Sequence, residues 1–238
     1  MIASLINYLN SYNLFTQTLN LSIGVQIITG IIEFSTLFIN VKPDILFLKD
    51  LLVVEFAVQI IELLFYIWLF TNLHNVSNIT SKRYADWIIT TPTMLFTLIM
   101  YLIYINKTSN NGNKENIKLS NTFNQNKENI FIILFLNLLM LIFGYLGETE
   151  QLNKTYAVTF GFFPFILYFW LIYENYAKYS DFGKKLFYYF FIVWTFYGIV
   201  AYFPYYLRNS CYNILDLFAK NFFGLYLAYL IIINSNIL

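Results

Sequence analysis

A single lysine, Lys220, lies in the middle of an almost wholly apolar run from Cys211 to Ile233. An ammonium group at the centre of a membrane helix raises the free energy of insertion by roughly 2.5–3.5 kcal/mol, so such residues are rare and usually functional. Asp216 precedes the lysine by one helical turn, where its carboxylate can pair with it, and Asn213 extends the polar line by another turn. Two interpretations stay open here: a buried structural ion pair, or a neutral amine that condenses with an aldehyde to form a Schiff base.

A second polar group opens another apolar segment, within the sequence RYADWIITTP at residues 83–92. Helical periodicity predicts that five of its polar residues share one face of a helix, namely Arg83, Asp86, Thr90, Thr93 and Thr97. This face therefore carries a cation and an anion at one end and hydroxyl groups at the other.

The composition indicates a membrane protein. Of the 238 residues, 59% are hydrophobic and only 11% are charged, whereas a soluble domain carries about 25% charged residues. A net charge of +1 provides no basic surface for nucleic acid, and one cysteine excludes an internal disulfide and a cysteine-based metal site. We therefore expect no metal and no nucleic-acid partner, and an integral, multi-pass protein in a lipid bilayer.

Seven apolar stretches are each about long enough to cross a bilayer. We expect one domain, 1–238, made of a seven-helix bundle. Turn-forming residues separate the stretches, including a break at 208–210, and an Asn- and Lys-rich loop is expected over 106–129. The expected spans are Leu14–Asn40, Ile45–Phe70, Arg83–Ile105, Ile130–Gly147, Tyr156–Tyr176, Leu186–Leu207 and Cys211–Ile233.

The basic residues predict the orientation of the bundle. The loops after the first, third and fifth spans hold nine lysines, and the opposite side holds four lysines and arginines. Because cytoplasmic loops carry the excess of basic residues, we expect the amino terminus outside and the carboxyl terminus in the cytoplasm.

Two segments together indicate a family. The sequence at 83–92 resembles the third helix of microbial rhodopsins, and Leu215-Asp216-Leu217-Phe218-Ala219-Lys220 resembles their seventh. The resemblance implies that Lys220 carries all-trans retinal as a Schiff base, with Asp86 and Asp216 as counterions. Carboxylates near a buried imine keep it protonated, and Arg83 would balance the second negative charge.

The same resemblance implies a retinal pocket drawn from the third to the sixth spans. For each aromatic residue taken alone, ordinary packing in a bundle is the simpler explanation, and only the shared pattern favours a pocket. The expected lining residues are Trp87, Thr91, Met140, Gly144, Phe163, Trp194 and Tyr197.

Rhodopsins differ in their output, and two positions argue against a strong outward proton pump. Pumps use a carboxylic proton donor about three turns from the counterion, where this chain has Thr97, and commonly an acid near the outer surface, where it has Arg208. A hydroxyl group cannot deliver a proton at useful rates. Glu148 or Glu150 could substitute for the outer acid.

Polar stripes on the first two spans favour a channel. Ser22, Gln26, Thr29 and Glu33 recur at helical spacing, as do Glu55, Gln59 and Glu62. Intramembrane acids usually face the bundle interior or a water-filled cavity and mark ion pathways, and acidic linings suit cations. The alternative is that these side chains only join helices by hydrogen bonds.

Channelrhodopsins provide a further resemblance. Ser22, Glu55 and Asn221 resemble their central constriction, and Thr91 and Asn137 lie where those channels link the third and fourth helices. The Glu55 and Glu62 pair, with Asn213, looks more like the viral rhodopsins of group one.

We therefore predict a non-enzymatic photoreceptor that works as a light-gated channel for monovalent cations and protons. An outward proton pump is the alternative, a sensory rhodopsin is a third option, and a homo-oligomer is left open. The middle gate would comprise Ser22, Glu55 and Asn221 and the outer gate Glu62, Arg83 and Asn213, with Gln59 on the same path.

Overall fold

The computed structural model describes residues 8–74, 78–111 and 117–235, which form helices joined by short turns with no β-strand among them. Two short segments, η2 and η3, are π turns that continue their neighbouring helices. In chain order, the helical elements are α2 (Tyr12–Leu37), η1 (Pro43–Ile45), α3 (Leu46–Thr71), α4 (Ile79–Asn111), α5 (Leu119–Glu148), α6 (Lys154–Ile172), η2 (Tyr173–Ala177), α7 (Asp181–Val200), α8 (Tyr205–Asp216), η3 (Leu217–Asn221) and α9 (Phe222–Asn234).

These elements make seven rods in the described part of the chain, because α6 continues through η2 and α8 continues through η3 into α9. Six rods are long and apolar enough to cross a membrane. The seventh, α7, has 20 residues, about the required length, but two lysines in its first turns and three tyrosines lower its mean hydropathy. The prediction of an all-α seven-helix membrane bundle is confirmed.

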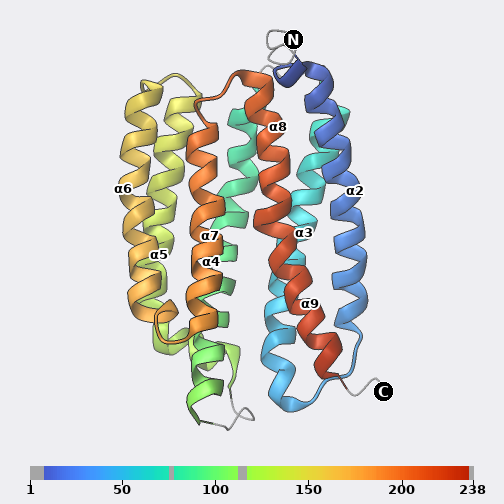
Figure 1. Ribbon diagram of the computed structural model, residues 1–238, viewed down its shortest axis with the longest axis vertical. Coiled ribbons are helices and arrows are strands. Elements are labelled where there is room, and N and C mark those ends of the chain that lie inside the picture. The colour runs from blue at the N-terminus through green and yellow to red at the C-terminus, as the bar shows by residue number, and fades with distance from the viewer. Residues whose placement is uncertain (1–7, 75–77, 112–116, 236–238) are drawn as a thin grey trace.

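The rods stand side by side (Figure 1), and the contacts between them close them into a ring. Each packs against its neighbour in chain order, and α2 also contacts α8 and α9, which joins the first rod to the last. α2 begins at the upper end of Figure 1 and α9 ends at the lower end. These two ends are called the α2 end and the α9 end below; which of them faces the cytoplasm stays a prediction.

The interior of the ring is apolar on one side and polar on the other. A large hydrophobic cluster joins α4, α5, α6, α7 and α9 with the first half of α3. In contrast, α2 turns mostly polar side chains inward and leaves Leu21, Ile28 and Ile31 more than half exposed on its outer face. Because lipid is as apolar as a protein core, a helix can bury its polar face and expose its apolar one only inside a membrane bundle.

Two predicted boundaries are wrong. Most of the expected loop over 106–129 is helical, because α4 runs on to Asn111 and α5 begins at Leu119; residues 112–116 lie outside the described part of the chain. The predicted break at 208–210 lies inside α8, and the chain instead turns before Pro204, the residue that precedes this helix. Proline lacks an N–H and has a fixed φ, so it cannot continue a helix from the preceding residues, and the new helix begins directly after it.

Close packing of α5 against α6 provides a test of the fold. A Cβ atom at Gly147 would lie 2.6 Å from the Cβ of Ala157, so Gly147→Ala must push the two helices apart. We expect a loss of about 1–3 kcal/mol in unfolding free energy, as for other overpacked interiors, measured as a lower denaturation temperature of the purified protein. The matched control is Gly24→Ala, because a Cβ there meets no atom within 4 Å. Equal stability of the two variants would contradict this packing.

Candidate functional site

Lys220 lies in the π turn η3 and is 3% exposed, surrounded by carboxylates from three helices. Its Nζ is 2.5 Å from Asp86 Oδ2 on α4 and 3.7 Å from Asp216 Oδ1 at the end of α8. The structure therefore brings together the lysine and both predicted counterions. A third carboxylate is also present, because Glu62 Oε1 on α3 lies 3.6 Å from the same nitrogen.

The position of Glu62 corrects its predicted place at an outer gate with Arg83 and Asn213. Glu62 is fully buried against Lys220, and neither of its carboxylate oxygens has a hydrogen-bond partner among the described residues. Helical periodicity predicted the face of α3 on which Glu62 lies, but not which residue of the opposite helix it would meet.

Arg83, a second buried cation, lies nearer the α2 end of the bundle than Lys220 does and is fully buried. Its Nη1 is 3.2 Å from Asp216 Oδ2, and its Nε donates to Asn209 Oδ1 at 3.2 Å. Its Nη2 donates to the side chain of Asn213 and to the backbone of Asn209. Arg83 and Asn213 therefore meet as predicted, with Asn209 as an additional partner.

Two phenols complete the surroundings of Asp216. Tyr66 donates to Oδ2 and Tyr197 to Oδ1, each at 2.7 Å. Tyr66 also accepts a hydrogen bond from Arg83 at 3.2 Å. The role of Tyr66 was missed, because a tyrosine in a chain with 21 of them gives no sequence signal.

A cavity lies beside Lys220, between α4, α5, α6, α7 and α8, and its walls are mostly apolar. Six of the seven predicted pocket residues line it, namely Trp87, Thr91, Met140, Gly144, Trp194 and Tyr197. Glycines allow some of its walls to approach: a Cβ at Gly144 would overlap with the Tyr84 hydroxyl, and a Cβ at Gly198 would lie 2.5 Å from the Phe162 ring. The cavity suits an elongated apolar ligand anchored at Lys220, which lies on its wall.

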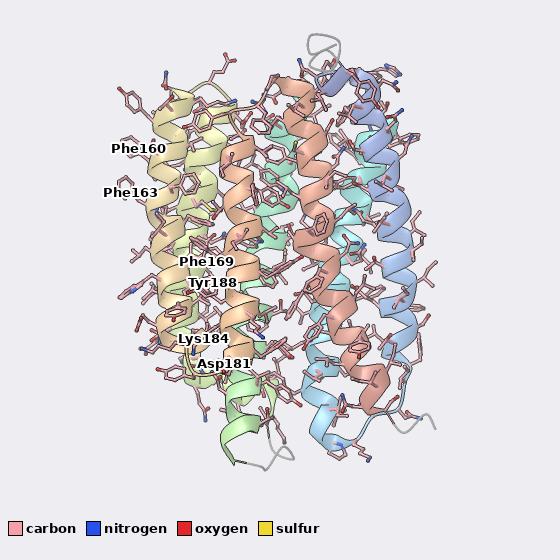
Figure 2. All side chains as sticks on the ribbon, in the orientation of Figure 1. Phe160, Phe163, Phe169, Asp181, Lys184 and Tyr188 are labelled. Atoms are coloured by element: carbon pink, nitrogen blue, oxygen red, sulfur yellow. The ribbon has the colours of Figure 1, made fainter. Side chains whose placement is uncertain are left out.

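The seventh predicted pocket residue, Phe163, is an error of register. Its side chain is 67% exposed and points away from the bundle on the outer face of α6, as Phe160 does (Figure 2). Phe162 and Phe165 line the cavity instead. One residue changes the direction of a helical side chain by about 100°, and α6 has no charged or amide residue beyond its first residue, Lys154, to set its register.

The polar side chains of the other half face one another in a continuous band, here called the polar seam. Every member is at most 2% exposed. The polar seam comprises Ser22, Gln26 and Glu33 on α2, Glu55, Gln59 and Glu62 on α3, Thr97 on α4, Asn213 on α8 and Asn221 on η3. Two other threonines predicted for the polar face of α4 bond within their own helix. Thr90 is fully buried and donates to Asp86 O, and Thr93 is half-buried and donates to Ile89 O.

The predicted central constriction of Ser22, Glu55 and Asn221 is divided among three places along the polar seam. Ser22 Oγ donates to the backbone oxygen of Asn213 at 2.9 Å, nearer the α2 end. Asn221 Nδ2 donates to Gln59 Oε1 at 3.2 Å, and Glu55 accepts a hydrogen bond from Thr97. These contacts differ from the prediction because Gln59, one turn along α3 from Glu55, reaches Asn221 first.

The middle of the polar seam is formed by amides. Gln59 Nε2 donates to Gln26 O at 3.0 Å while its Oε1 accepts from Asn221. The Gln26 side-chain amide and Asn221 Oδ1 have no hydrogen-bond partner among the described residues. Buried polar atoms are nearly always paired with protein or water, so this stretch can accommodate water or a hydrated ion.

One predicted contact and one predicted candidate acid concern the α5 helix. Thr91 Oγ1 donates to Asn137 Oδ1 at 2.9 Å, which links α4 to α5 at the place expected from the channel resemblance. Near the α2 end, Glu148 Oε2 lies 3.2 Å from Arg208 Nη2, and Lys154 Nζ lies 3.6 Å from Glu148 Oε1. Glu148, one of the two candidate outer acids, is thus held by two cations.

The comparisons with known proteins agree with this geometry. A family model described as bacteriorhodopsin-like protein matches residues 15–234. The viral rhodopsin OLPVRII superposes with a TM-score of 0.75 at 27% identity, over 91% of this chain and 97% of that one. The proton-pumping rhodopsin AR2 from the marine alga Acetabularia acetabulum has a TM-score of 0.69 at 17% identity, over 94% and 98%. Bromide-bound halorhodopsin from Halobacterium salinarum has a TM-score of 0.67 at 14% identity, over 98% of both chains.

No curated protein matches the sequence. The solved relatives include a proton pump and a halorhodopsin, so they agree on the fold and not on what is moved. Because the family model covers all seven rods almost completely, the chain belongs to the bacteriorhodopsin-like family of microbial rhodopsins, which are integral, multi-pass membrane proteins that bind retinal.

Proposed function

We propose that this rhodopsin is a light-gated cation channel whose retinal is attached to Lys220. One observation carries the channel half of the proposal: buried carboxyl and amide side chains face each other along α2, α3, α4 and α8–α9, apart from the apolar cavity. Acidic side chains in a membrane interior favour passage of cations over anions. The proposed cargo is monovalent cations and protons, with the α2 end outside.

The residues around Lys220 fit retinal. The cavity is bounded by aromatic rings from α4 and α7, including Trp87, Trp194 and Tyr197. Lys220 is the one lysine among the described residues that line it. Bound there, retinal would supply absorption of visible light and a change of shape on isomerisation.

The geometry favours Asp86 as the acceptor of a proton from Lys220 Nζ. Asp86 Oδ2 lies 2.5 Å from this nitrogen, and Asp86 Oδ1 has no hydrogen-bond partner among the described residues. Asp216 already accepts from Tyr66, Tyr197 and Arg83, so it has less capacity for a further proton. We therefore assign the first proton transfer to Asp86.

This transfer would open the polar seam. Lys220 and Arg83 offset most of the charge of the three nearby carboxylates in the closed state, and loss of the positive charge at Nζ leaves Glu62 without a cation. An unpaired buried charge is costly, so water or a cation is expected to enter beside Glu62. The Arg83–Asp216–Asn213 contacts near the α2 end would form the outer gate, and Gln26, Gln59 and Asn221 the middle one.

One observation favours the alternative of an outward proton pump. Thr97 occupies the position at which pumps have a carboxylic donor, and its hydroxyl donates to Glu55. Glu55 therefore places a carboxyl group next to that position, from the neighbouring helix. This arrangement makes the direction of current, rather than the set of residues, the decisive measurement.

The channel is tested by photocurrents in a voltage-clamped cell. We expect the photocurrent to reverse its sign as the membrane potential crosses the equilibrium potential of the permeant cations, because flow through a pore follows the gradient. A pump would keep one sign at every potential, and a sensor would give no current. The control is Lys220→Ala, which should give no photocurrent. A current of constant sign would exclude the channel and leave the pigment intact.

The attachment site is tested by the visible absorption of protein purified with all-trans retinal. We expect Lys220→Ala to lose the visible band, because no other lysine among the described residues lines the cavity. The matched control is Lys184→Ala, which removes an amine on the outside of α7 beside Asp181 (Figure 2) and should keep the band. A full visible band in Lys220→Ala would place the linkage elsewhere.

A further inference from the structure

Two further acids, Glu33 and Glu55, lie in the polar seam between Lys220 and the α9 end of the bundle. No role assigned above involves both of these residues. Glu33 on α2 is 1% exposed, and its Oε2 has no hydrogen-bond partner among the described residues. Glu55 on α3 is 2% exposed and accepts a hydrogen bond from the Thr97 hydroxyl.

The backbone of α9 holds Glu33 in this inward position. The Glu33 carboxyl group lies directly against Gly224, and a Cβ atom at this glycine would overlap with both Glu33 Oε1 and, at 2.8 Å, Glu33 Cδ. Phe34 and Phe56, which follow the two acids, pack with ring centroids 5.6 Å apart and align α2 with α3 at the same level. Glycine at 224 is therefore what leaves room for a carboxyl group here.

The pair has no basic partner. Neither Glu33 nor Glu55 forms an ion pair among the residues that the structure describes, whereas Glu62, Asp86 and Asp216 all lie near Lys220 or Arg83. Buried carboxyl groups without a counter-charge either stay protonated or bind a cation, because burial of unpaired anions is costly.

We propose that Glu33 and Glu55 form a binding site for a permeating monovalent cation, with Gly224 as the residue that positions Glu33. The inference rests on the proposed channel function and adds a selectivity site to it. The free Oε2 of Glu33 faces no competing donor. No group of three or more acidic, histidine or cysteine side chains that could hold a metal ion is found in the described part of the chain. Such a sparse set of ligands suits weak binding of Na⁺ in transit rather than tight binding of a divalent ion.

The first readout is the permeability of Na⁺ relative to K⁺, obtained from the reversal potential of the photocurrent with the two ions on opposite sides. We expect Glu33→Gln to change this ratio roughly tenfold, the factor produced by about 1.4 kcal/mol of binding free energy. Gly224→Ala should produce a change in the same direction because its methyl group displaces the Glu33 carboxyl group. The double variant Gly224→Ala/Glu33→Asp, with a shorter acid, should restore part of the ratio.

Matched controls separate this effect from general damage. Glu128→Gln makes the same chemical change at an exposed position of α5, and Gly24→Ala adds a methyl group where no atom lies within 4 Å. Both should keep the wild-type ratio. The visible absorption band, measured for every variant, reports whether the protein folds around its chromophore.

A second readout does not need conduction. Purified wild-type protein should denature at a higher temperature in sodium chloride than in choline chloride of equal concentration, because a ligand that binds only the folded state stabilises it. Glu33→Gln should lose this difference, and Glu128→Gln should keep it. If the wild-type photocurrent does not reverse, the channel is excluded and this sodium effect alone decides the binding site.

The outcomes are distinguishable. A reversing wild-type current together with an unchanged ratio in Glu33→Gln would overturn the selectivity site and leave the channel standing. A sodium effect that persists in Glu33→Gln would overturn the binding site. The proposal is supported if Glu33→Gln and Gly224→Ala both change the Na⁺/K⁺ permeability ratio and both lose the rise in denaturation temperature in sodium chloride, while the two controls keep the wild-type values.

Discussion

The positive charge of Lys220 in the interior of an apolar bundle is the constraint on which the rest of the structure depends. An isolated ammonium group would be strongly unfavourable there, so carboxylates must reach it from several directions. Asp86 comes from α4, Asp216 from α8 and Glu62 from α3, all within 3.7 Å of its nitrogen. Three helices are thereby fixed in height and rotation around one atom.

This requirement also explains why the bundle has two unlike halves. The excess of carboxylates over cations near Lys220 has to be solvated, and the amides and hydroxyls of α2, α3, α8 and η3 provide a polar environment for it. The opposite half, built from α4 to α7, contains aromatic rings and leaves an apolar cavity. The polar seam and the apolar cavity therefore lie on different sides of the same lysine.

Much of this arrangement follows from spacing along the chain. Asp216 and Lys220 are one turn apart, and the polar residues of α2 and α3 recur at helical intervals, so their inward faces could be predicted. On the predicted polar face of α4, Thr93 is only half-buried, and its hydroxyl bonds within its own helix. The expected loop over 106–129 is largely helical because polar Asn and Lys residues outside the membrane do not by themselves end a helix.

Contacts between helices were harder to predict, because they depend on relative height. Ser22 meets Asn213 rather than Glu55, and Glu62 meets Lys220 rather than Arg83. A vertical shift of one turn, about 5.4 Å, is enough to exchange such partners while every residue keeps its face. The prediction of Phe163 as a pocket residue was wrong for a different reason. Helix α6 is apolar on almost every side, so only packing decides which of its faces turns inward.

The π turn at η3 has a consequence for how the last rod is assembled. In an ordinary α-helix, neighbours on one face are three or four residues apart, whereas the wider i→i+5 turn brings residues five apart onto one side. Asp216 and Asn221 are five apart and both reach α3, through Tyr66 and Gln59 respectively. The extra residue of the π turn therefore sets the rotation of α9 about its own axis. Shortening this turn by one residue would rotate all of α9 and point Asn221 and Gly224 away from α2 and α3.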